Sequence, residues 1–292
     1  MPNSENRKAS LDIVCDYREL DEQTRMSIEG VPYKELPDEI LLEPKIDLVF
    51  SRIRDAVVLD LTKRVENPRA AEVRRRLQAH LEKRADDPNA AVHLRHLQRG
   101  EDIKPKEGSQ QMYLVNDEVV QGVLNIDADN HVPTIPRRDG IDDRSAIVKA
   151  HSHPSTAPFS RGDLGIMLKS DEYPADKCIY PLVAGDLDFL AIVSSDAPRL
   201  PVARLRTELR IGHRFQDMDA YFAELDELGK ALPSTIPPGR PLQFATQLTD
   251  ALNLGNQFKV GIYARESQDK TGVFKRLSIP QVPIITGRVQ NF

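Results

Sequence analysis

Tryptophan is absent from this sequence of 292 residues, and cysteine occurs only twice. Cys15 and Cys178 lie far apart in the chain, which argues against a disulfide framework and against a cysteine-rich zinc module. No run of about 18 apolar residues occurs, so we expect no segment that spans a bilayer. The first ten residues, MPNSENRKAS, have no apolar signal core. These absences together predict a soluble cytoplasmic protein that does not bind membranes.

A strong excess of charge of either sign is also missing. Lys and Arg number 40 against 45 Asp and Glu, a formal net charge of -5. Because there is no global basic field, nucleic acid is not an expected partner. Only residues 63–99 are locally basic, either as a solvated helical surface or as a face that docks an acidic partner or nucleic acid. The length suits one elaborated domain or two.

The first hundred residues are predicted to be mainly helical. The segment KIDLVFSRIRDAVVLDL has apolar residues at helical spacing, and residues 69–82 and 89–99 follow the same pattern. Pro88 cannot continue the helix before it and so separates the last two. The polar segment EDIKPKEGSQQ at 101–111 then indicates a domain boundary near residue 101.

The second part, residues 101–285, is predicted to be an α+β domain. Short apolar runs rich in β-formers alternate with helical segments, and GDLD between two of the runs is typical of a hairpin turn. A helical insertion is expected at about residues 200–255. The expected strands are MYLV, EVVQGVLNI, AIVKAHSH, KCIYPLVAG, FLAIVSS, QFKVGIYARE and VFKRLSI, and the expected helices are 161–170, 215–232 and 241–253.

The segment AIVKAHSHPSTAPFSRGDLGIM contains residues that could bind a metal. His151 and His153 stand at positions i and i+2 of an expected strand, so both imidazoles point to the same face. Pro154 ends that strand. Ser160 and Asp163 then have the spacing of a capping box, which places a carboxylate on the first turn of a helix.

These three side chains offer the donor atoms that zinc prefers. Two imidazole nitrogens and one carboxylate oxygen leave the fourth zinc position open, as in catalytic rather than structural sites. A zinc ion there acidifies water and polarises a carbonyl. His-x-His alone often serves packing, and Ser-x-x-Asp alone is a common helix cap. Their combination at a strand-to-helix junction predicts one zinc per chain, held by His151, His153 and Asp163.

The segment HSHPSTAPFSRGD resembles the signature of the JAMM (MPN+) metalloproteases, in which His-x-His and Pro precede a loop and Ser-x-x-Asp. The resemblance implies an MPN-like, cytidine-deaminase-like mixed sheet with flanking helices. It also implies that His151, His153 and Asp163 bind zinc and that Ser160 stabilises the tetrahedral intermediate. The loop from Pro154 to Phe159 has six residues, where the family usually has seven.

The same resemblance implies a glutamate upstream, at the start of a strand, that acts as general acid and base. Glu118 opens the expected strand EVVQGVLNI and is the candidate. The alternative for this residue is a solvent-facing position after a turn at Asn116 and Asp117. Glu107, in the polar segment, is the second candidate for the catalytic glutamate.

The resemblance implies a zinc-dependent peptidase or isopeptidase. Its expected substrates are proteins, such as ubiquitin-like conjugates or precursors with tails to be trimmed. Two alternatives remain: a catalytically inactive scaffold of the MPN type, and a RadC-like protein associated with DNA. The net charge of -5 argues against the last of these.

Overall fold

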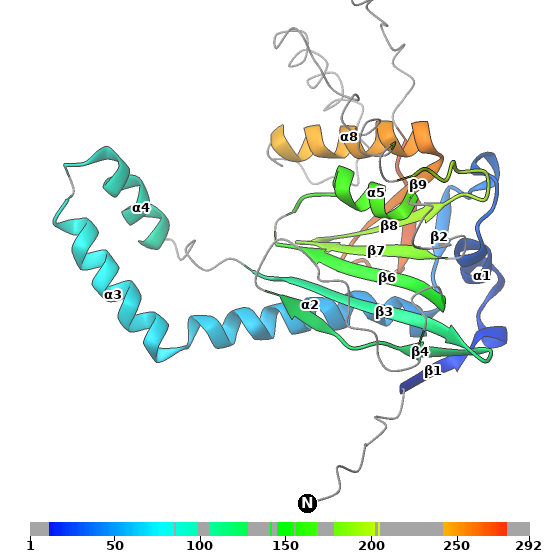
Figure 1. The fold of residues 1–292 in the computed structure, drawn as a ribbon, viewed down its shortest axis with the longest axis horizontal. Coiled ribbons are helices and arrows are strands. Elements are labelled where there is room, and N and C mark those ends of the chain that lie inside the picture. Colours follow the sequence, from blue (N-terminus) through cyan, green and yellow to red (C-terminus); the bar gives the residue numbers. More distant parts are fainter. Residues whose placement is uncertain are drawn as a thin grey trace, which may run out of the picture. The chain divides into compact units, whose positions relative to one another are not determined.

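The computed structural model describes an α+β protein with a mixed, largely antiparallel sheet and, within the described residues, six α-helices (Figure 1). The predicted fold class is therefore confirmed at the level of α+β. The chain divides into two compact units. The structure describes residues 12–84, 86–98, 105–127, 141, 145–154, 156–168, 178–201, 204 and 242–278.

The first unit comprises residues 1–19, 44–155 and 181–185, so the expected boundary near residue 101 falls inside it. The three helices predicted for the N-terminal part are confirmed as α2, α3 and α4. Its elements are β1 (Asp12–Asp16), α2 (Pro44–Val65), α3 (Pro68–Glu82), α4 (Pro88–Gln98), β3 (Glu107–Val115), β4 (Glu118–Gln121), β5 (Asn125–Asp127) and β6 (Ala146–His153).

Helix α2 packs on one face of strand β3. Its apolar residues recur at helical spacing, and Ile46, Val49, Phe50 and Ile53 are buried. A Cβ atom added to Gly108 would lie 3.0 Å from Cγ2 of Val57 and 3.3 Å from Cγ2 of Ile53. The absence of a side chain at Gly108 thus allows the helix to approach the strand closely.

Strand β3 begins at Glu107, inside the segment predicted to be a polar boundary. The expectation that the strand starts at Met112 is corrected here, because hydrogen bonds accommodate the polar residues. The Gly108 N–H donates to Oγ of Ser152 at 2.8 Å, and Nε2 of the buried Gln110 donates to the Gly122 carbonyl at 3.2 Å. Strand β3 pairs antiparallel with β5, β4 and β6.

The hairpin between β3 and β4 turns at Asn116 and Asp117, as in the alternative considered for Glu118. Both residues have positive φ angles, 50° and 65°, which suits a tight two-residue hairpin. The run EVVQGVLNI is not one strand. The first strand, β4, ends just before Gly122, and β5 begins at Asn125. A Cβ atom at Gly122 would lie 2.9 Å from the Gln111 carbonyl oxygen, so the chain can pass there only with glycine.

The second unit comprises residues 20–43, 156–180 and 186–292. Strands β8 and β9 pair antiparallel from Leu187 opposite Glu266 to Val193 opposite Val260. The predicted closing hairpin is confirmed, since β9 pairs antiparallel with β10. The elements are α1 (Glu22–Glu29), β2 (Glu39–Leu41), α5 (Arg161–Leu168), β8 (Leu187–Val193), α8 (Leu242–Phe258), β9 (Val260–Glu266) and β10 (Val273–Arg276).

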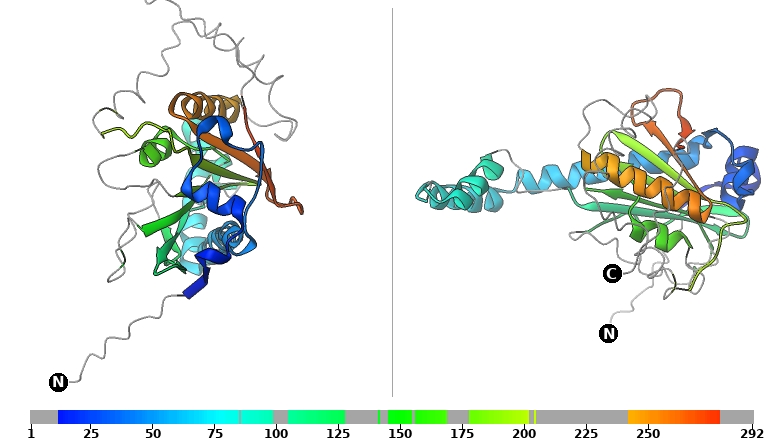
Figure 2. Two further views of the ribbon diagram at one scale, coloured as in Figure 1. Left: turned by 90° about the vertical axis from the view of Figure 1, so that its right-hand side faces the viewer. Right: turned by 90° about the horizontal axis from the view of Figure 1, so that it is seen from above.

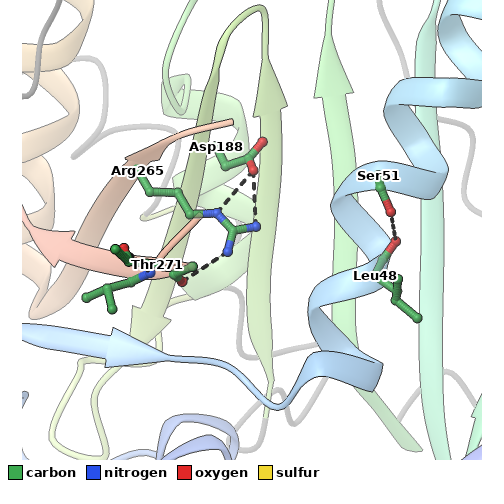
Figure 3. Close-up of polar contacts among 7 residues, drawn as sticks. Leu48, Ser51, Asp188, Arg265 and Thr271 are labelled. Carbon is green, nitrogen blue, oxygen red and sulfur yellow. Dashed lines mark hydrogen bonds and ion pairs between the residues drawn. The ribbon is translucent and has the colours of Figure 1, made fainter. Parts of the chain in front are cut away.

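A buried ion pair holds β8, β9 and β10 together (Figure 3). Nε and Nη2 of Arg265 each lie 3.2 Å from Oδ2 of Asp188, the residue directly opposite on β8. Nη1 of Arg265 donates to the Gly272 carbonyl at 3.0 Å, and the guanidinium lies 4.2 Å from the centroid of the Phe274 ring. The ion pair thus satisfies the two buried charges of a strand pair whose other buried residues are mainly apolar.

The strand order of the sheet is β1-β4-β3-β6-β7-β8-β9-β10-β2, where β7 is Ile179–Ala184 and β5 pairs with β3. The predicted helix 241–253 is α8, which continues to Phe258. The predicted helix 215–232 lies outside the described residues, as does most of the expected insertion. None of the helices in the described part of the chain is long and apolar enough to cross a membrane.

Candidate metal centre

His151 and His153 project from the same face of strand β6. Along β6 the even-numbered residues Val148, Ala150 and Ser152 are buried, and the two histidines that alternate with the last of them are partly exposed. This alternation follows from the two-residue period of a strand. The two Nε2 atoms lie 3.2 Å apart, so both imidazoles converge on one point.

Asp163 lies on the first turn of α5 in the capping box predicted from the sequence. The Ser160 N–H donates to Oδ2 of Asp163 at 2.6 Å, and the Asp163 N–H donates to Oγ of Ser160 at 3.2 Å. These reciprocal bonds satisfy two backbone donors at the helix start and fix the carboxylate to the turn. The Ser160 hydroxyl accepts in this arrangement, which leaves its hydrogen able to donate.

The ligand atoms of His151, His153 and Asp163 all lie within 4.8 Å of one another, and the three side chains are partly buried. Within the described residues, no other group of three His, Cys, Asp or Glu side chains meets the same condition. Tetrahedral ligands at 2.0–2.1 Å from zinc lie roughly 3.3 Å apart. The 3.2 Å between the two Nε2 atoms fits that geometry. The loop with six residues therefore does not prevent the three side chains from gathering.

Glu107 lies beside the histidine pair, on the neighbouring strand. Ser109 of β3 is directly opposite His151, and the antiparallel register continued by two residues brings Glu107 opposite His153. Directly opposite residues share a face of the sheet. The position of Gly108 agrees, because it faces α2 and therefore directs Glu107 to the other side. Glu107 does not belong to the group of three ligands.

Glu118 lies far from the histidines. It is exposed, opens β4 and pairs with Val115 at the far end of β3. Val115 lies six positions after Ser109, which is roughly 20 Å along a strand. The structure does not bring Glu118 to the histidine pair, and its position matches the solvent-facing alternative.

Two further carboxylates lie on the strands next to the histidines. Asp163 is among the three ligands, Glu107 stands opposite His153 in the continued register, and Asp127 of β5 is directly opposite Glu107. Neutral imidazoles and carboxylates are the donors that a divalent cation requires. From the sequence, Glu107 was only the second candidate for the catalytic glutamate and Asp127 was not considered, because the placement of both depends on strand pairing.

Comparisons with protein-family models, with curated proteins and with solved structures find no match to this chain.

Proposed function

We propose that this protein is a zinc-dependent hydrolase that cleaves peptide or isopeptide bonds. The observation that carries the proposal is the convergence of the ligand atoms of His151, His153 and Asp163, with Glu107 on the adjacent strand. Three protein ligands leave a coordination position for water or substrate, which favours a catalytic centre over a structural one.

The zinc would be held by His151, His153 and Asp163. When bound, it would act as a Lewis acid that activates water and polarises the scissile carbonyl. Glu107 accepts a proton from the attacking water and later delivers it to the leaving amine, as a general base and then a general acid. Ser160 donates its hydroxyl hydrogen to the oxyanion that develops in the transition state. Glu107 takes this role in place of Glu118, because roughly 20 Å of strand separates Glu118 from the histidines.

The substrate class follows from the resemblance of HSHPSTAPFSRGD to the JAMM signature. We propose protein substrates with a ubiquitin-like tail, either joined to a lysine or present as a precursor extension. An MPN-type scaffold without activity is the rival. The carboxylate of Glu107 beside the ligands supports hydrolysis, because a scaffold has no use for a proton acceptor at that position.

The test is hydrolysis of a tail-extended ubiquitin-like precursor and of an unstructured peptide mixture, measured with and without a chelator. The proposal expects cleavage that stops on chelation and returns when zinc is restored. Cleavage that is unaffected after zinc has been removed completely would contradict a metal mechanism. If the wild-type chain binds zinc but cleaves neither substrate, and so does not differ from its Glu107→Gln variant, the result would support the scaffold.

A further inference from the structure

The start of α5 has a second anchor besides the capping box. Arg161, the first residue of the helix, forms a two-pronged ion pair with Asp250 of α8 (the two helices are seen in Figure 2). Its Nε lies 2.7 Å from Oδ2 of Asp250, and its Nη2 lies 3.2 Å from Oδ1. Such fork-shaped contacts fix direction as well as distance.

The first residues of α5 have a weak intrinsic preference for a helix, so an anchor there adds to its order. The helix has only eight residues, RGDLGIML, and two of them are glycines, which disfavour helical structure. Its buried residues, Leu164, Met167 and Leu168, all come after Asp163. From Ser160 to Asp163 no side chain is fully buried, although Phe159 before this stretch and Leu164 after it are. The ion pair therefore adds a polar contact where the turn itself has no apolar packing.

Helix α8 offers a firm support for this anchor. It has 17 residues, and Leu248, Ala251 and Leu252 around Asp250 are buried. The side chains of Arg161 and Asp250 are 34% and 22% exposed. Partial shielding of this kind reduces the screening that weakens ion pairs in open solvent.

The geometry of a helix links this ion pair to the metal ligand. Successive residues turn by about 100°, so side chains two positions apart point in nearly opposite directions. When Arg161 is held against α8, Asp163 is therefore directed away from α8. The capping box ties the Asp163 carboxylate to the same turn, so a rotation of the turn would move the carboxylate with it.

We propose that Arg161 and Asp250 are positioning residues that set the rotation of the first turn of α5 and so hold Asp163 in its ligating direction. This inference rests on the zinc site of the proposed function. Partners that orient metal ligands typically change metal affinity by 10- to 100-fold when they are removed.

The experiment compares the full-length chain with its Arg161→Ala, Asp250→Ala and double-alanine variants. Zinc affinity is measured by chelator competition, and the coordination geometry by the visible absorption of the cobalt-substituted protein. Each single variant should bind zinc about 10- to 100-fold more weakly and show a changed cobalt spectrum. The double variant should be no worse than either single one, because both remove the same contact.

Two further variants separate positioning from general stability. Lys259→Ala removes another ion pair of the same unit, to Asp196 at 2.8 Å, and should leave zinc affinity and the cobalt spectrum unchanged. Asp250→Asn keeps the side-chain shape and should show the affinity loss even if the alanine variants fold poorly. If the wild type binds zinc and the zinc affinity of Asp250→Asn is within twofold of the wild-type value, the inference is overturned but the proposed function is not. A wild-type chain that binds no zinc would overturn the proposed function as well.

Discussion

Glu107 and Glu118 each begin a strand, and strand pairing gives them different surroundings. Glu107 is partly buried and lies opposite His153 in the continued register, whereas Glu118 is exposed at the other end of the β3–β4 hairpin. A general base must reach the reacting water within hydrogen-bond distance or through one further water. Proximity therefore favours Glu107, although both residues offer the same carboxylate.

Glu107→Gln should slow hydrolysis by roughly 100- to 10,000-fold, since a positioned proton-transfer group contributes about that much. Its zinc content and unfolding transition should stay close to those of the wild type, because glutamine keeps the shape of the side chain. Glu118→Gln is the matched control and should retain full activity. The assignment is wrong if the two variants lose activity to the same extent.

The histidines and Asp163 could be predicted from the sequence because their geometry is local. An i, i+2 pair on a strand and a capping box need only neighbouring residues. Glu107 could not be placed in the same way. It precedes Ser109 and Gln110, two buried polar residues that hide the alternation expected of a strand. Their burial depends on partners far along the chain, such as Ser152 and Gly122.

Ser160→Ala removes both a helix cap and the proposed oxyanion donor. The lost cap should lower the free energy of unfolding by about 1 kcal/mol, measured by denaturant titration. The lost donor should lower the hydrolysis rate by roughly 100-fold or more. Ser160→Thr keeps the hydroxyl and should retain most of the stability and activity. A variant that loses stability but keeps its rate would limit Ser160 to capping.

The spacing of apolar residues and the positions of turn residues predicted most of the helices and strands. Apolar residues at helical spacing gave α2, and β-rich runs gave β6, β8 and β9. The division of EVVQGVLNI into two strands was missed, because it depends on the close approach of Gly122 to the Gln111 backbone. The sequence shows the glycine, but it does not show that the Gln111 backbone lies against it in the folded chain.

The ion pair between Asp188 and Arg265 should be costly to break. Asp188→Ala leaves the guanidinium of Arg265, itself only 9% exposed, without its carboxylate. Breaking a buried pair typically lowers the free energy of unfolding by about 3–5 kcal/mol, which denaturant titration would measure. The double variant Asp188→Leu/Arg265→Met should recover most of that loss, because no buried charge remains. Equal losses in both variants would contradict this account.

The three helices α2, α3 and α4 differ in what they pack against. Helix α2 packs on β3 through Ile53 and Val57 around Gly108. Helices α3 and α4 pack on each other and share a small core of Leu81, Ala90 and Leu97. Hydrophobic spacing in residues 1–100 could not distinguish these roles, since all three helices have apolar residues at helical spacing.

A chain that begins at residue 101 should therefore fail to fold, because it lacks α2 and exposes the face of β3 that α2 covers. Replacement of residues 67–104 by a flexible Gly/Ser linker should instead preserve the unfolding transition and zinc content, since α3 and α4 share a small core of their own. Circular dichroism and metal analysis would check both. A folded, zinc-loaded chain from residue 101 would show that α2 is dispensable.

The metal content of the purified full-length protein is the decisive measurement for the proposed zinc site. Elemental analysis should find about one zinc per wild-type chain. The His151→Ala/His153→Ala variant should contain almost none, because Asp163 alone binds weakly. The Glu118→Gln variant should match the wild type. Full zinc occupancy in the double histidine variant would contradict the account.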